Sequence, residues 1–234
     1  MRAALDAGAP VESLFVGAEG LGTEPVDALV ERALAAGVRV YDLGAGVMER
    51  VADTVTPQPL CAVVAMVDVE PVSCVRGLAP TGERLVVVCV DVRDPGNLGA
   101  VIRSAAAAGA SAVLCCEGTA DPFNPKAVRA TAGAVFALPI ARGLDGAEAI
   151  SLLASEGFRV VATTAREGTD YAVANLSGDV ALLLGNEAAG LSPEVVALAD
   201  EQVTIPMAAG TESLNVAMTA TVLSHEIARR RRLR

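Results

Sequence analysis

The chain has 234 residues, of which 53% are hydrophobic and 20% are charged, and its formal net charge at pH 7 is −10. This length allows one large domain or two small ones, and the apolar content is ample for a packed core. No uninterrupted apolar run reaches the roughly 18 residues of a membrane span, and the N-terminus lacks the basic and apolar regions of a secretory signal. We therefore expect a cytoplasmic protein with no membrane partner.

The distribution of charge bears on nucleic-acid binding. Taken alone, the negative net charge argues against a nucleic-acid partner, because phosphate binding depends on Lys and Arg. Five of the last six residues are arginine, however, and this basic tail can either touch RNA or form a disordered end. Further basic residues lie in or near candidate loops of the central region, namely Arg93, Arg103, Lys126, Arg129 and Arg142.

The cysteines point to no metal chemistry. Their positions lack the spacing of metal ligands, and an adjacent pair lies in an apolar run where alternate side chains point to opposite faces. We expect no metal site and interpret all five as reduced core residues: Cys61, Cys74, Cys89, Cys115 and Cys116.

Residues 1–70 alternate between short apolar and helical patterns, which predicts a small α/β domain. Pro25 suits the first turn of a helix and Gly37 suits its end. The expected elements are a strand at 13–17, a helix at 25–36, a strand at 38–41, a short helix at 47–52 and a strand at 60–67. Residues 71–82 hold two prolines and two glycines, so we expect a linker there.

Residues 83–234 predict a larger α/β domain with a mostly parallel sheet. The strands are near-continuous apolar runs, as expected when helices cover both faces of a parallel sheet. In chain order we expect a strand at 84–91, a helix at 97–109, strands at 112–116, 158–163, 180–184 and 203–205, and helices at 146–156 and 193–198.

The C-terminal stretch passes from strand to loop to helix. An apolar run at 203–207 ends in an Ala-Ala-Gly-Thr turn, and an apolar helix begins at Ser213. Ser213 or Thr211 can cap this helix, and Glu212 adds negative charge near its positive end. The helix is apolar on two faces, so it either crosses the core of a monomer or is covered by a partner subunit. Asn215 is a polar amide in this helix and needs partners.

A first motif runs from Asp91 to Arg103, off a strand and into an Ala-rich helix. The spacing of Gly96 and Gly99 is not that of a dinucleotide fingerprint, and no acidic ribose anchor follows, which argues against a nucleotide-dependent oxidoreductase. Asn97 suits the N-cap position. Arg103 lies in the second turn, where it either forms a structural salt bridge or binds an anionic ligand beside the free N–H groups of the helix start.

A second motif follows the strand at 180–184. Asn186 and Glu187 come directly after this strand, and loops at the carboxyl ends of parallel strands build binding crevices. Gly185 and Gly190 allow close approach of the backbone. Alone, this motif would be an ordinary turn, but together with the C-terminal stretch at 205–217 it indicates more than a turn.

Together, three motifs resemble those of a known family. They are Asn97-x-Gly99-x-x-x-Arg103, then Leu184-Gly185-Asn186-Glu187-x-x-Gly190, then Ile205-Pro206-Met207 with Ser213-Leu214-Asn215-Val216-Ala217. Their order and approximate spacing strongly resemble the SpoU/TrmH family of SPOUT RNA ribose 2′-O-methyltransferases. Residues 124–136 also look like the segment between the family's first two motifs, with Thr131 where a serine is common. The resemblance spans residues 83–234.

The resemblance implies a fold, a cofactor and an assembly. The C-terminal chain would be threaded into a deep trefoil knot, an exception to the rule that connections do not thread loops. S-adenosylmethionine would bind in this knot, and the protein would form a homodimer through the knot and the C-terminal helix. By position, the residues implied to bind the cofactor are Thr163, Leu184, Gly185, Glu187, Gly190, Ile205, Met207, Leu214, Asn215 and Ala217.

The implied activity is S-adenosylmethionine-dependent 2′-O-methylation of a ribose in structured RNA. Large-subunit ribosomal RNA is the leading candidate for the substrate, and transfer RNA is the alternative. Residues 1–70 look like the small RNA-binding domain often found ahead of this catalytic domain. Family members usually carry a further helix and strand before the equivalent of Ala3, so we expect this chain to be truncated or to start late.

Methyl transfer from a sulfonium to a ribose hydroxyl is an in-line displacement that needs no metal. The resemblance makes Arg103 the essential arginine of the first motif. A guanidinium is a poor general base, so we expect Arg103 to hold the target phosphate and stabilise the developing alkoxide. Asn97, Glu187, Ser213 and Asn215 would organise the pocket. The alternative is a catalytically inactive RNA-binding homologue, against which the intact motifs argue.

Overall fold

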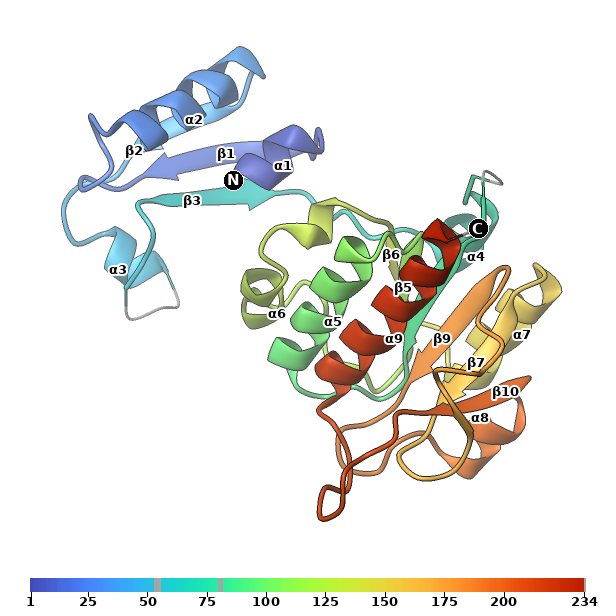
Figure 1. Ribbon diagram of the computed structural model, residues 1–234. Helices are drawn as coiled ribbons and strands as arrows, with labels where there is room; N and C mark the ends of the chain where they lie inside the picture. The colour runs from blue at the N-terminus through green and yellow to red at the C-terminus, as the bar shows by residue number, and fades with distance from the viewer. Residues whose placement is uncertain (53–55, 80–81, 234) are drawn as a thin grey trace. The chain divides into compact units, whose positions relative to one another are not determined.

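A computed structural model describes residues 1–52, 56–79 and 82–233 (Figure 1). The chain divides into two compact units, Met1–Val67 and Asp68–Arg234. This division lies close to the boundary expected after residue 70. The second unit contains all three motifs.

The first unit is a three-stranded sheet with helices around it. Strand β1 (Val11–Val16) lies in the centre, parallel to β2 (Arg39–Asp42) and antiparallel to β3 (Leu60–Val64). Helix α2 (Glu24–Ala35) packs on the sheet through a small apolar core that includes Leu14, Val16 and Val26. The five expected elements are present, and the last strand ends at Val64 instead of residue 67. The unit also contains the short helices α1 (Arg2–Asp6) and α3 (Met48–Val51).

The second unit is built on a seven-stranded sheet with the order β6-β5-β4-β9-β7-β10-β8, and all neighbouring strands pair in parallel. The expectation of a mostly parallel sheet is confirmed. The central strands β4 and β9 are buried along their whole length, as a sheet covered on both faces requires. The strands are β4 (Leu85–Cys89), β5 (Ala112–Cys115), β6 (Ile140–Arg142), β7 (Arg159–Thr163), β8 (Thr169–Asp170), β9 (Val180–Leu184) and β10 (Glu201–Thr204).

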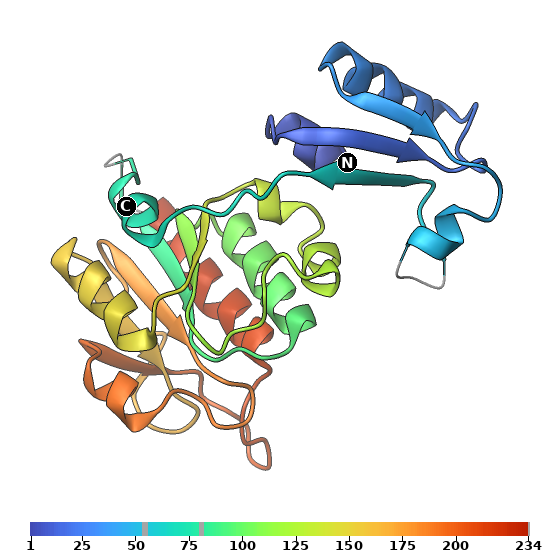
Figure 2. The same cartoon turned by 180° about the vertical axis from the view of Figure 1, so that it is seen from behind.

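Two layers of helices cover this sheet (Figures 1 and 2). Alternation along β4 separates them: Val87 belongs to the core under one layer, and Val86 belongs to the core under the other. The first layer contains α5 (Pro95–Ala107), α6 (Pro125–Ala130), the short 3₁₀ helix η1 (Ala134–Phe136) and α9 (Val216–Arg232), and the second contains α4 (Pro71–Arg76), α7 (Gly146–Ser155) and α8 (Pro193–Ala197).

Helix α4 occupies half of the segment that was expected to be a linker. The Glu70 side chain accepts hydrogen bonds from the N–H groups of Val72 and Ser73, and the helix buries Cys74 and Val75 against the second unit. Pro71 lies in the first turn, where its missing N–H costs nothing. A proline there marks a helix start as readily as a break, so residues 71–76 belong to the packed second unit.

The caps of α5 and α9 differ from the sequence-based expectation. Asp94 caps α5, and its carboxylate accepts from the N–H of Asn97 at 2.9 Å, which places Asn97 inside the first turn. Asn215 caps α9 by accepting from the N–H of Ala217 at 2.8 Å. Neither Ser213 nor Thr211 caps α9, because residues 205–215 form a loop and the helix begins only at Val216.

Helix α9 buries one of its two apolar faces in this chain. Val216, Ala220, Leu223 and Ile227 belong to the core, whereas Met218 is 59% exposed. The second face is therefore only partly covered in the single chain, since Ala217 also packs in the core and Met218 does not. It remains available for a partner.

The arginines at the end of α9 hold the helix to its own unit. Glu226 accepts hydrogen bonds from Arg229 and Arg230, which lower the pKa of Glu226 to about 2 against the opposing effect of partial burial. Arg230 also donates to the carbonyl oxygens of Ala174 and Tyr171, at 2.6 and 2.5 Å. At least Arg230 therefore has a structural role, and this part of the tail is an ordered helix.

The described part of the chain contains no helix that is long and apolar enough to cross a bilayer. In the same residues, no group of three or more His, Cys, Asp and Glu side chains could hold a metal ion. All five cysteines are free, and four of them are buried. Burial raises the pKa of the Cys116 thiol to about 12, so this thiol stays protonated near neutral pH.

Gly99 lies where α5 passes close to α6. A Cβ at this position would lie 2.3 Å from the carbonyl oxygen of Ala127 and 2.6 Å from the Cβ of Ala130. We expect Gly99→Ala to lower the free energy of unfolding by about 1–3 kcal/mol, because overpacking outweighs the gain of about 1 kcal/mol in helix propensity. Urea denaturation followed by circular dichroism measures this change.

Gly44→Ala provides the control for this substitution. A Cβ at Gly44 meets no atom within 4 Å and Gly44 has no positive φ, so its stability should change by less than about 0.5 kcal/mol. A Gly99→Ala protein as stable as the wild type would contradict the close packing of α5 on α6.

Candidate functional site

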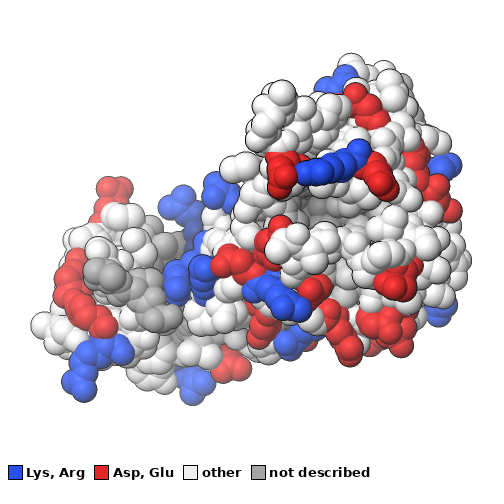
Figure 3. All heavy atoms as spheres, turned by 90° about the horizontal axis from the view of Figure 1, so that it is seen from below, with Lys and Arg blue, Asp and Glu red and all other residues white. Residues whose placement is uncertain are grey.

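A cavity of about 270 Å³ opens at the carboxyl ends of the strands in the second unit. Its walls come from residues 163–165 at the end of β7, residues 185–191 after β9 and the loop that leads from β10 to α9. Side chains of α8 and α9 close its inner end, through Val196, Val216 and Leu223. Figure 3 views the lower side of Figure 1 and shows a hollow with acidic and basic side chains at its rim.

Gly185 forms the tightest point of this wall. A Cβ built on Gly185 would lie 2.4 Å from both the carbonyl carbon of Gly190 and the nitrogen of Leu191. Only glycine allows the strand end to approach the returning loop this closely. The glycine of the second motif therefore shapes the cavity by keeping the loop 185–191 folded back on β9.

Asn186 joins the loops of the first two motifs. Its amide nitrogen donates to the backbone oxygen and the carboxylate of Asp91, at 3.0 and 3.1 Å, and its oxygen accepts from the N–H groups of Ala188 and Ala189. These four bonds use both donors and both lone pairs of the amide. Asp91 has a φ of 58°, a left-handed conformation that non-glycine residues adopt rarely. Asn186 thus acts as a clamp between loops.

Glu187 connects the second motif to the first and third. Its carboxylate accepts from the N–H groups of Arg93 and Asp94 at 3.1 Å and from the amide of Asn97 at 3.0 Å. Asn97 in turn accepts from the amide of Asn215 at 3.0 Å, and Asn215 caps α9. A continuous network of side chains therefore joins all three motifs at the edge of the cavity.

The network also sets the charge of Glu187. Partial desolvation raises the pKa of this carboxyl, but the hydrogen bonds from Asn97, Asp94 and Arg93 outweigh it and hold the pKa below its usual value. Glu187 is therefore ionised at neutral pH. Because Glu187 lines the cavity, its negative charge favours a cationic ligand there.

Arg103 stands apart from this network. Its side chain is exposed on α5, and within residues 1–52, 56–79 and 82–233 it has no hydrogen-bond or ion-pair partner. The salt-bridge interpretation left open by the sequence therefore finds no partner in this part of the chain. Arg103 does not line the cavity, so it can act only on a group that reaches beyond the cavity itself.

Most residues singled out for cofactor binding line the cavity, and three do not. Leu184 lies in the apolar core because alternation along β9 turns it inward, Ala217 packs in the same core, and Asn215 uses its side chain in the network. The residues that line the cavity are Thr163, Gly185, Glu187, Gly190, Ile205, Met207 and Leu214, together with Ser213 from the proposed catalytic set.

Sequence reasoning missed several residues of this site. Thr164 lines the cavity, and its hydroxyl oxygen is buried with no hydrogen-bond partner among the described residues. Leu191 and Val196 also line the cavity, and Asp91 anchors the second motif. The position of Thr164 directly after β7 is a usable signal, because strand ends at one sheet edge converge. No local pattern indicates Val196, which α8 brings in by tertiary packing.

Comparisons with known proteins identify relatives of this chain. Residues 84–225 match the SpoU rRNA Methylase family. An uncharacterised tRNA/rRNA methyltransferase of Mycobacterium ulcerans (strain Agy99) is 33% identical over 97% of this chain and 74% of its own length.

Two solved structures are similar over nearly the whole chain. The AdoMet-bound rRNA methyltransferase from Sinorhizobium meliloti has a TM-score of 0.84 and 32% identity, and the match covers 98% of this chain and 85% of that one. An RNA 2′-O ribose methyltransferase has a TM-score of 0.80 and 32% identity, with 100% and 86% covered.

The fold and the site define an α/β protein of the RNA methyltransferase class. The chain belongs to the SpoU rRNA methylase family. The resemblance inferred from the three motifs is thereby confirmed.

The pKa of Glu187 predicts a pH dependence of stability. Since the folded-state pKa is depressed, this group contributes stability that is present above the unfolded value of 4.5 and is lost as pH falls through the folded pKa. We expect Glu187→Gln to be less stable than the wild type at pH 7 by about 1 kcal/mol. This loss is smaller than that expected for a buried charged hydrogen bond, because the carboxylate is exposed to solvent. Urea midpoints measured at descending pH should converge below pH 4.5. Parallel curves would refute the assignment.

Gly185→Ala should impair cofactor binding if the cofactor occupies this cavity, because residues 190 and 191 must move away from β9 and deform the cavity wall. We expect the affinity for S-adenosylmethionine to fall at least about tenfold, or roughly 1.4 kcal/mol. Isothermal titration calorimetry measures this, with Gly44→Ala as the control that should bind like the wild type. Unchanged affinity in Gly185→Ala would show that the cofactor lies elsewhere.

Proposed function

We propose that this chain transfers a methyl group from S-adenosylmethionine to the 2′-hydroxyl of a ribose in structured RNA of the large ribosomal subunit. The observation that supports this best is the network of Glu187, Asn97 and Asn215, which joins the three motifs beside the cavity. Transfer RNA is the alternative candidate substrate, since the Mycobacterium ulcerans relative is named a tRNA/rRNA methyltransferase.

The cavity fits S-adenosylmethionine, which the Sinorhizobium meliloti relative binds. The buried Thr164 hydroxyl has no hydrogen-bond partner among the described residues, and apolar side chains from Ile205 and Leu214 form part of the wall. When bound, S-adenosylmethionine supplies a methyl group on a positively charged sulfur. The ionised carboxylate of Glu187 faces the same cavity and favours a ligand of that charge.

The residues of this chain would catalyse by positioning. Thr163, Gly185, Gly190, Ile205, Met207 and Leu214 would hold the cofactor, while Asn97, Glu187, Ser213 and Asn215 would fix the shape of the pocket. Aligning the ribose hydroxyl with the methyl group removes much of the entropic barrier of an in-line transfer. No covalent enzyme intermediate and no metal are required for this chemistry.

Arg103 is proposed to act on the RNA. Its exposed guanidinium has no partner among the described residues, so it is free to bind a phosphate near the target ribose. A guanidinium stays protonated and makes a poor base, but it stabilises negative charge that develops on the ribose oxygen. This role accounts for an exposed arginine on a helix that carries no other charged residue.

The assembly proposed for the second unit is a homodimer with a knotted C-terminal chain. The loop 205–215 and the loop 185–191 line one cavity, as a threaded chain would require. The partly covered face of α9, which carries the exposed Met218, offers a surface for the partner subunit. The first unit is proposed to bind RNA.

We expect Arg103→Ala to reduce methylation at least about a hundredfold while S-adenosylmethionine affinity changes less than about twofold, because Arg103 lies outside the cavity. The assay uses the full chain, S-adenosylmethionine, and large-subunit ribosomal RNA or transfer RNA from cells that lack the gene. Mapping of 2′-O-methyl positions identifies the RNA and the nucleotide.

Arg76→Ala is the matched control for this experiment. Arg76 is also exposed, but it pairs with Glu156 on the opposite face of the sheet, so its loss should leave methylation near the wild-type rate. Near-normal methylation by Arg103→Ala would refute the role of Arg103. Cofactor binding without methylation of either RNA by the wild type would instead favour an inactive RNA-binding homologue.

A further inference from the structure

The sheet of the first unit has one face that α2 does not cover. Leu14, Val16 and Val40 point into the core under α2. The strand register places the intervening residues on the opposite face, because Phe15 pairs with Tyr41 and Cys61, and Ser13 pairs with Arg39 and Val63. We call this the open face, defined by Ser13, Phe15, Arg39, Tyr41, Cys61 and Val63; Ser13, in its centre, is itself buried.

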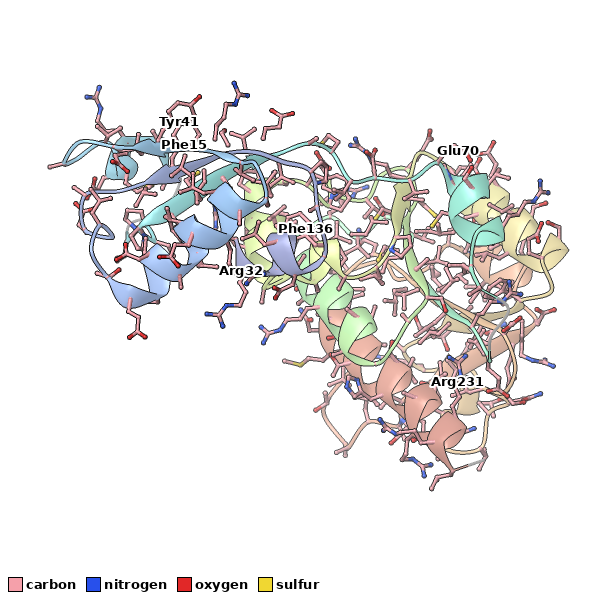
Figure 4. The ribbon with its side chains drawn as sticks, turned by 90° about the horizontal axis from the view of Figure 1, so that it is seen from above. Phe15, Arg32, Tyr41, Glu70, Phe136 and Arg231 are labelled. Atoms are coloured by element: carbon pink, nitrogen blue, oxygen red, sulfur yellow. The ribbon has the colours of Figure 1, made fainter. Side chains whose placement is uncertain are left out.

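The open face carries a stacked aromatic pair. The ring centroids of Phe15 and Tyr41 lie 5.4 Å apart with an interplanar angle of 20°. Tyr41 is 44% exposed and lies on β2, one of the two edge strands of the sheet. Figure 4 shows both rings on the side of the sheet away from α2. Phe15 thus packs against the Tyr41 ring, and the exposed part of that ring is a surface on which a further planar ring can stack.

The charge of the open face differs from that of the rest of the unit. Glu24, Asp27 and Glu31 are exposed on α2, at the opposite side of the sheet. Arg39 is the single charged member of the open face. Its side chain is exposed, and no described residue forms a hydrogen bond or ion pair with it. A planar aromatic surface beside an unpaired cation suits a ligand that combines a planar ring with an anion.

We propose that the open face binds an unpaired nucleotide of the substrate RNA, with its base stacked on Tyr41 and its phosphate held by Arg39. The base must be unpaired, because stacking on a side chain requires a face that a duplex hides. The nature of this substrate rests on the proposed function. Stacking also explains how a chain of net charge −10 can bind RNA, since the attraction between rings does not depend on net charge.

The test uses the full chain and a single-stranded RNA of about ten nucleotides that contains 2-aminopurine, whose fluorescence falls on stacking. We expect Tyr41→Ala to weaken binding at least about fivefold and to abolish the quenching, whereas Tyr41→Phe keeps both. Leu34→Ala is the control, since Leu34 is 57% exposed on α2, away from the open face. Chemical denaturation verifies that each variant is folded.

Two further arms address the phosphate and the pairing of the base. Arg39→Gln should reduce the slope of log affinity against log salt by about 0.7, the value for one phosphate contact with a single strand. A duplex of the same sequence should bind without sensitivity to Tyr41→Ala. The proposal is supported if Tyr41→Ala weakens binding of the single strand and leaves binding of the duplex unchanged.

Quenching and affinity that survive Tyr41→Ala would overturn the inference, as would equal sensitivity of single strand and duplex. It would also be overturned if Tyr41→Ala left RNA binding intact but changed the sedimentation of the protein, since the open face would then contact a protein. Failure of the proposed function has a different signature. In that case no RNA is methylated, yet Tyr41-dependent quenching of the single-stranded probe persists.

Discussion

The carboxylate of Glu187 fixes the relative positions of the three motifs. It accepts hydrogen bonds from two backbone N–H groups ahead of α5 and from the amide of Asn97. Asn97 in turn accepts a hydrogen bond from Asn215 at the start of α9. Hydrogen bonds therefore connect the loop after β9, the start of α5 and the C-terminal helix. Because the carboxylate is ionised, these bonds are stronger than those between neutral groups, and they hold the cavity in one shape.

Close backbone approach is the second constraint on the site. At Gly185 the strand end touches the returning loop, and at Gly99 helix α5 touches α6, so two glycines of the motifs serve packing. The clamp between Asn186 and the strained Asp91 adds to this rigidity. A site that works by alignment needs such rigidity, since small displacements of reacting groups cost much of the rate.

The two proposals divide RNA recognition between the units. In the second unit an exposed Arg103 would hold the phosphate near the reacting ribose, and in the first unit Tyr41 would stack on an unpaired base. The arginines at the end of α9 contribute less to this than their number indicates. Arg231, marked in Figure 4, donates to the carbonyl oxygens of Arg84 and Gly178, as Arg230 does to other carbonyls.

By itself the sequence determined the class of fold and the family, because apolar runs and motif spacing are local properties, and the family resemblance named eight of the nineteen residues that line the cavity. It did not locate the caps of α5 and α9, the helix at 71–76 or the contribution of Val196. Only the tertiary structure decided that Asn97 and Asn215 share a hydrogen bond and that Leu184 faces the core. These features depend on which strands become neighbours, and long-range packing fixes that choice.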